Sequence, residues 1–196
     1  MPRSQARTQI ERRRSAVVRR AAALLVVGLA GCASITVERC ASIDWQQQGH
    51  ADGRAGFGTA RLERHREACA PAGVLPDKAA WEAARADGLR EYCRLSNAIP
   101  QGLARHAYEK VCADPRFEQA HAAARRFGDA RYQVEFLDGQ IDWRERELLT
   151  NKKLSAEKRA GHVAELRSLQ RQRERAIDER EEASRALDLI RQRLGI

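Results

Sequence analysis

The stretch WQQQGHADG, residues 45–53, decides the fold class. Its two glycines, Gly49 and Gly53, are four residues apart, and residues at this spacing lie on one face of a helix. Small residues on one face let the backbone of a neighbouring helix come close, although each glycine weakens a helix by about 1 kcal/mol relative to alanine. The stretch therefore predicts a helix that packs tightly against another helix in a thin core.

Two further stretches repeat this spacing. The second copy is Trp81-x2-Ala84-x3-Gly88, and a weaker third is His121-x2-Ala124-x3-Gly128. Three copies at roughly regular spacing indicate the duplication of a short helical unit. No run of residues alternates apolar and polar side chains with the period of two that a half-buried strand requires. We therefore predict an all-α fold.

The tail from residue 129 onward contains no proline or cysteine and is rich in charged residues. Apolar residues recur at helical spacing in its first part: Val134, Leu137, Ile141 and Leu148. After a polar break at residues 150–154, Ser155 is placed to cap a second helix. Two helices joined by a short polar turn form an αα-hairpin. The pattern predicts a long charged αα-hairpin, coiled-coil-like, over residues 129–196.

The seam of this second helix is predicted to be polar. A heptad followed from Val163 places five polar residues on it: Gln170, Arg173, Arg180, Ser184 and Arg191. Polar residues on a seam weaken the pairing of two helices. The far half of the hairpin is therefore expected to need a partner, and the alternative is a solvated, partly ordered tail.

The N-terminus has the three parts of a secretory signal. Seven arginines and one acid in the first twenty residues precede an uncharged apolar run at 21–30. As a helix this run would rise about 15 Å, roughly half of a bilayer core, which is short for a permanent span. Leu29-Ala30-Gly31-Cys32 resembles the bacterial lipobox, whose cysteine is acylated. We predict a signal peptide over residues 1–31 that is removed, and a covalent lipid, palmitate included, on Cys32.

The residue after the cysteine indicates the membrane. Ala33 stands where an aspartate would resemble an inner-membrane retention signal, so we predict the periplasmic face of the outer membrane. Loss of residues 1–31 removes seven of 36 Lys and Arg and one of 27 Asp and Glu, and the net charge falls from +9 to +3. Such a charge does not predict a nucleic-acid partner.

Four cysteines remain once Cys32 is set aside: Cys40, Cys69, Cys93 and Cys112. An even number fits an oxidising compartment, and four cysteines allow three pairings. We favour the two pairs of chain neighbours, Cys40 with Cys69 and Cys93 with Cys112. A four-ligand zinc site is the alternative, because His65 and His106 each lie close before a cysteine, although no CxxC motif is present.

These observations divide the chain into four parts. Residues 1–31 are the signal peptide, 32–43 a lipidated tether, 44–128 a small disulfide-bridged helical domain, and 129–196 the charged helical hairpin. A domain of this size commonly needs covalent staples.

Several spaced motifs together resemble a known family. They are Asp44-Trp45-x3-Gly49-x2-Asp52-Gly53, Arg61-Leu62-x2-His65-x3-Cys69, Gly73-x2-Pro76-Asp77, Gly88-Leu89-x2-Tyr92-Cys93, Asn97 and Tyr108-x2-Val111-Cys112. This set is similar to proteobacterial lipoproteins that carry domain of unknown function 2799. The resemblance supports the lipid anchor and the four cysteines, and it implies no activity.

The expected function is that of a non-enzymatic outer-membrane lipoprotein, a structural or interaction protein of the envelope. Its expected partners are the membrane, through the lipid, and a periplasmic protein, through the C-terminal hairpin. We predict no catalytic residue, no metal and no cofactor besides the lipid. The alternative is a protein that binds or cleaves cell-wall glycan with Trp45, Asp52, His65 and Asp87, two of which would form a carboxylate pair. An aspartate before glycine is, however, also common at helix ends and turns.

Overall fold

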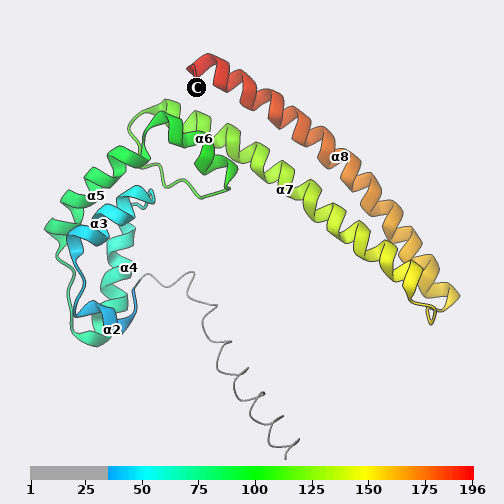
Figure 1. Cartoon of the computed structure of the whole chain (residues 1–196), viewed down its shortest axis with the longest axis horizontal. Helices are drawn as coiled ribbons and strands as arrows, with labels where there is room; N and C mark the ends of the chain where they lie inside the picture. The colour runs from blue at the N-terminus through cyan, green and yellow to red at the C-terminus, as the bar shows by residue number, and fades with distance from the viewer. Residues whose placement is uncertain (1–34) are drawn as a thin grey trace, which may run out of the picture. The chain divides into compact units, whose positions relative to one another are not determined.

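The structure is a computed structural model that describes residues 35–196 (Figure 1). The predicted signal peptide and Cys32 lie outside the described residues. Within them the chain forms helices and no strand, in the order α2 (Val37–Cys40), α3 (Trp45–Arg54), α4 (Ala60–Cys69), the 3₁₀ helix η1 (Ala70–Ala72), α5 (Lys78–Tyr92), α6 (Leu95–Leu103), α7 (Pro115–Thr150) and α8 (Ala156–Leu194). The predicted all-α fold is confirmed.

The described residues fall into two compact units. The first contains residues 35–43 and 64–75, and the second contains 44–63 and 76–196, so the boundary between them lies inside α4. In the first unit a disulfide joins Cys40, at the end of α2, to Cys69, at the end of α4, with 5.5 Å between the Cα atoms. Part of the predicted tether is therefore folded, because α2 is bonded to α4.

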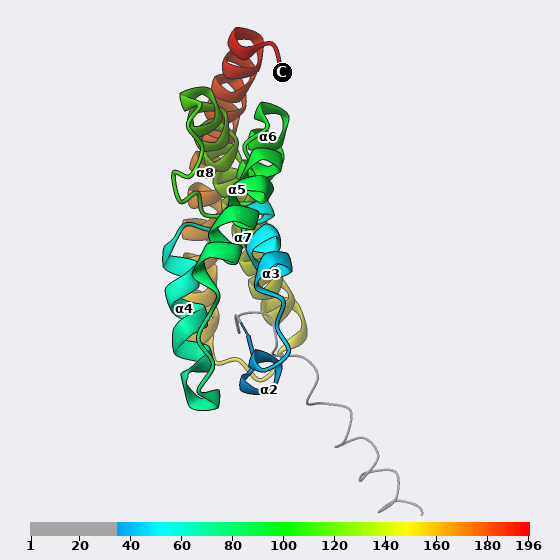
Figure 2. The same ribbon diagram turned by 90° about the vertical axis from the view of Figure 1, so that its left-hand side faces the viewer.

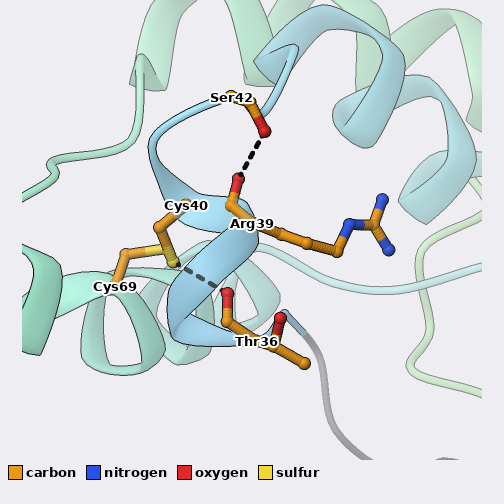
Figure 3. The surroundings of a disulfide bond; sticks show 5 residues. All are labelled: Thr36, Arg39, Cys40, Ser42 and Cys69. Carbon is orange, nitrogen blue, oxygen red and sulfur yellow. Dashed lines mark hydrogen bonds between the residues drawn. A yellow bond between two sulfur atoms is a disulfide. The ribbon is translucent and has the colours of Figure 1, made fainter.

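Both cysteines of this disulfide are buried. Figure 3 shows the bond and the residues around it. The Sγ of Cys40 lies 3.4 Å from the carbonyl oxygen of Thr36. A disulfide sulfur carries no hydrogen, so this is a packing contact. The hydroxyl of Ser42 donates to the carbonyl oxygen of Arg39 at 3.3 Å and closes the turn after α2.

In the second unit α3 and α5 lie side by side, as Figures 1 and 2 show. The glycines of the quoted stretch are responsible. A Cβ on Gly49 would collide with the backbone of Trp81, and a Cβ on Gly88 would collide with the carbonyl oxygen of His50. The close approach predicted from the spacing is present, and the first two copies of the motif face each other across it.

The third copy of the motif packs against a different helix. A Cβ on Gly102 of α6 would collide with the carbonyl oxygen of His121, and one on Gly128 would lie 2.9 Å from the carbonyl oxygen of Leu103. Helix α6 therefore covers the face of α7 that carries the third copy. Its own small residue, Gly102, lies outside the repeated spacing.

An aromatic core joins α5, α6 and the start of α7. Its buried members are Tyr92, Ala98, Phe117 and Ala120. The disulfide between Cys93 and Cys112 borders it, so both favoured cysteine pairs are present. Two residues near the end of α8, Ile190 and Leu194, pack against the same core. The far part of α8 is therefore helical and held by the domain.

The hairpin consists of α7 and α8, which run side by side (Figure 1). Asp114 accepts a hydrogen bond from the backbone N–H of Arg116 at the start of α7, and Ser155 accepts one from the N–H of Lys158 at the start of α8. The predicted helix start at Ser155 is confirmed. Because no residue breaks α7, it passes through residue 129, where the composition changes, without interruption.

The predicted seam of α8 is only partly right. Leu187, a position of the heptad counted from Val163, is buried, whereas the row through Gln170 and Ser184 lies one residue beyond the buried row. The buried positions of α8 are Leu169, Ala176, Ala183 and Leu187, and the first two pack with Val134, Leu137 and Ile141 of α7. Gln170, predicted to lie on the seam, is exposed, and Arg173, Arg180, Ser184 and Arg191 are half-buried. The heptad was anchored on Val163, a large apolar residue, whereas alanines occupy the closest part of the seam.

Candidate functional site

A buried polar network connects α3, α4 and α5. Asp52, only 2 % exposed, lies within α3 and accepts a hydrogen bond from the indole N–H of Trp81 at 2.8 Å. Its other carboxylate oxygen accepts from the side-chain amide of Gln48 at 3.0 Å. The guanidinium of Arg61 approaches the same oxygen to 3.5 Å. A buried charge needs such partners to offset its desolvation.

The network has a structural consequence. The Trp81–Asp52 bond lies between the two helices that the glycines bring together, so it fixes which side chains meet at their contact. The guanidinium of Arg61 also stacks over the ring of Phe57 at 4.5 Å from its centroid. Both oxygens of the Asp52 carboxylate therefore accept hydrogen bonds from structural partners, the indole of Trp81 and the amide of Gln48.

The second aspartate of the repeated motif lies elsewhere. Asp87 is exposed in the middle of α5 and pairs with Arg90, one turn further along the same helix. The interpretation of an Asp-Gly pair as a helix end holds for Asp52, which lies in the last turn of α3, and is wrong for Asp87, which lies inside α5. One carboxylate is buried between helices and the other is solvated.

A second cluster combines aromatic rings and a histidine. The ring centroid of Phe117 is 5.2 Å from that of Tyr92 and 5.3 Å from that of Tyr108. His121, 3 % exposed, lies 5.3 Å from Tyr108 and stacks on Phe117. Burial lowers the pKa of His121, and the positive charge of Arg125 lowers it further. The imidazole is therefore held in its neutral form as part of the core.

The hydroxyl of Tyr108 connects this cluster to the disulfide. It accepts a hydrogen bond from the backbone N–H of Cys112 at 3.1 Å. Burial raises the pKa of Tyr92, and the neighbouring Tyr108 raises it further. The phenol of Tyr92 therefore remains neutral within the packing of the core.

These clusters lie in the part of the chain that a comparison with known families identifies. The family model described as "Protein of unknown function (DUF2799)" matches residues 44–126. We refer to these matched residues, 44–126, as the DUF2799 domain. No curated protein and no solved structure matches the chain. The DUF2799 domain begins at Asp44, the residue that caps α3, and the match ends within α7.

The four cysteines within residues 35–196 are bonded in two pairs: Cys40 with Cys69, and Cys93 with Cys112. Their sulfur atoms are therefore not available as thiolate ligands. The alternative hypothesis of a zinc site bound by these four cysteines does not fit the structure. Across residues 35–196 no group of three or more His, Cys, Asp and Glu side chains is arranged to hold a metal ion. His65 is fully buried in the first unit, and His106 lies 2.7 Å from the side-chain oxygen of Gln101 on the surface.

The residues named for a glycan site lie in different environments. Trp45, Asp52 and His65 are buried, as is the second tryptophan of the repeated motif, Trp81, and Asp87 is exposed. A groove of about 390 Å³ borders α3 and α5, lined by Gln46, Gln47, His50, Ala51, Arg54, Ala84 and Asp87. Neither tryptophan lines it, so it offers no aromatic platform for a sugar ring.

A larger groove, of about 880 Å³, runs between α7 and α8. Its lining is charged and of mixed sign: Arg125, Arg126, Asp129, Glu179 and Glu182, with Ala122, Ala130 and Gln133. An ion pair between Arg126 and Glu182, at 2.8 Å, crosses it. Such a groove suits neither a strongly anionic nor an apolar ligand.

The sequence interpretation missed one surface on α7. Tyr132, Phe136 and Trp143 are each about half exposed, at 47 %, 50 % and 52 %. They are four and seven residues apart, and this second heptad spacing in α7 was the signal that could have found them.

None of the helices in residues 35–196 has the length and apolar composition that a membrane span requires.

Proposed function

We propose that this chain is a non-enzymatic lipoprotein of the outer membrane, in which the DUF2799 domain carries a helical hairpin that contacts other envelope components. The lipobox at Cys32 supports the anchor. The two disulfides support an oxidising compartment, because such bonds persist outside the cytosol.

The observation that carries the interaction role is the distribution of exposed apolar side chains. Within residues 35–196, most of the large ones lie on α7 and α8: Tyr132, Phe136, Trp143, Leu149 and Leu189. The polar groups of the DUF2799 domain, in contrast, bond mainly to one another. Three of them, Tyr132, Phe136 and Trp143, share one face of α7 by their spacing, and exposed apolar surface of this kind commonly marks an interaction site.

The anchor is tested by metabolic labelling with palmitate, with and without globomycin. The wild-type chain should incorporate label, and globomycin should block its processing. The Cys32→Ser variant should incorporate none, while its two disulfides still form. An unlabelled wild-type chain would contradict the anchor.

The interaction role is tested by photo-crosslinking in cells. Deletion of the hairpin is a poor test, because Ile190 and Leu194 belong to the core of the domain. A benzoylphenylalanine at Leu149, 79 % exposed on α7, is compared with one at Leu75, 76 % exposed in the first unit. Specific adducts should form from Leu149 alone. Equal products from both positions, or none from either, would contradict the role.

A further inference from the structure

One face of α7 carries an apolar surface that no other helix of residues 35–196 covers. We define the outer seam as Tyr132, Phe136, Gly139 and Trp143, whose spacings of four, three and four are those of a helix-pairing seam. The rings of Tyr132 and Phe136 stack with centroids 6.3 Å apart. The guanidinium of Arg105 lies 3.9 Å from the centroid of Tyr132, at one end of the seam.

The outer seam continues a face that is already used for helix packing. Helix α6 covers α7 at His121, Ala124 and Gly128, and the same face then continues uncovered through Tyr132 to Trp143. The opposite face of α7 is buried against α8. The outer seam is therefore the part of a helix-binding face that extends beyond the end of α6.

Gly139, at the centre of the seam, supports this reading. A glycine inside a helix weakens it relative to alanine, and at Gly49, Gly88 and Gly102 the absent side chain permits the close approach of another helix. A Cβ on Gly139 would meet nothing within 4 Å. The space beside Gly139 is available to a helix from outside the chain.

We propose that the outer seam binds the outer seam of a second copy of this chain, with the two α7 helices antiparallel. A two-fold axis between Leu137 and Asp138 places Phe136 opposite Gly139 of the second copy. The same axis places Tyr132 opposite Trp143 of the second copy. Each large ring thus meets a gap or another ring, and a two-fold interface repeats every contact twice.

Charges at the two ends of the seam favour this orientation. The end near Tyr132 carries two arginines and one aspartate, Arg105, Arg125 and Asp129. The end near Trp143 carries three acids and two arginines, Asp142, Glu145 and Glu147 with Arg144 and Arg146, and the guanidinium of Arg144 lies 4.5 Å from the centroid of Trp143. Antiparallel pairing brings ends of opposite net charge together, whereas parallel pairing brings like charges together. The acids beside the seam also disfavour an anionic lipid surface, which prefers Lys and Arg.

This inference rests on the proposed function only for the expectation that the hairpin makes contacts outside its own chain. Full-length chains with two different epitope tags are expressed together, with benzoylphenylalanine at Trp143. Irradiation should give a product of twice the chain mass that contains both tags. The same probe at Leu189, exposed on α8, should give no such product. A product with another protein, with lipid, or with nothing would overturn the proposal.

A pair of glycine variants tests the contact itself. Gly139→Leu and Gly161→Leu both place a side chain in open space on a helix. Gly139→Leu should lower the yield of the two-tag product at least tenfold, and Gly161→Leu should leave it unchanged. Both variants should keep the wild-type helix content by circular dichroism. Equal yields from the two variants would overturn the proposal. Palmitate labelling is scored separately, so a failed anchor and a failed self-association are distinguishable.

Discussion

At the scale of single residues, the bond between Trp81 and Asp52 best explains how the DUF2799 domain is specified. The two side chains come from different helices and are 29 positions apart in the sequence. Glycine spacing predicted that two helices meet, but the partner of a buried carboxylate depends on rotation and register that no local pattern encodes. The favoured disulfides were predictable because only three pairings exist.

A first prediction compares the two aspartates that precede glycines. Asp52→Asn places an amide donor among the donors of Trp81, Gln48 and Arg61, so one buried group loses its partner. The free energy of unfolding should fall by about 1–3 kcal/mol. Asp87→Asn changes an exposed side chain and should cost less than about 0.5 kcal/mol. Urea denaturation measures both, and equal losses would contradict the network.

A second prediction concerns pH. The pKa of His121 is lowered in the folded chain, so the unfolded chain binds a proton first as the pH falls. The stability that neutral His121 contributes is fully present at pH values above 6.5, the ordinary pKa of histidine. It is lost as the pH falls from 6.5 to the lowered pKa of the folded chain. His121→Phe keeps the ring beside Tyr108 and Phe117. Urea midpoints at pH 7.5 and 5.5 should differ less in this variant than in the wild type, and an unchanged difference would exclude His121.

At the scale of elements, helix ends were predictable and helix register was not. Asp114 and Ser155 cap α7 and α8 through bonds to residues two or three positions away, so the signal is local. The seam of α8 depends on Ala176 and Ala183, which a pattern search for large apolar residues passes over. The exposed aromatic residues of α7 were missed for a related reason. The apolar residues that face α8 already showed helical spacing, so a second row at the same spacing was not sought.

A third prediction tests the register of α8. Ala176 is buried against α7, so Ala176→Leu overfills a close contact and should cost about 1–3 kcal/mol. Gln170 is exposed, so Gln170→Leu should change stability by less than about 0.5 kcal/mol. The heptad counted from Val163 predicts instead that Gln170→Leu stabilises. Thermal denaturation followed by circular dichroism distinguishes the two registers.

At the scale of the whole molecule, the DUF2799 domain and the hairpin share one core. Ile190 and Leu194 of α8 pack with the cluster around Phe117, although α8 lies outside the matched residues 44–126. Composition predicted two separate parts because charge and proline content change at residue 129. Composition carries no information about where a long helix ends in space. The contact of the end of α8 with the core of the DUF2799 domain could therefore not be predicted.

A fourth prediction compares two neighbouring residues of α8. Ile190 is packed against the aromatic core and Leu189 is exposed. Ile190→Ala should lower the free energy of unfolding by about 1–2 kcal/mol, because a partly buried side chain loses part of its transfer energy. Leu189→Ala should be nearly neutral. The shared core is contradicted if the domain and the hairpin unfold in separate transitions and Ile190→Ala shifts only the transition of the hairpin.

The return of α8 also sets the order in which the chain can mature. Ile190 and Leu194 are synthesised long after Tyr92 and Phe117, yet they complete the same apolar cluster. Until they arrive, the aromatic rings have an open side that a chaperone or protease can recognise. A chain truncated within α8 would therefore leave these rings exposed to chaperones and proteases. Only a chain synthesised to the end of α8 covers them fully.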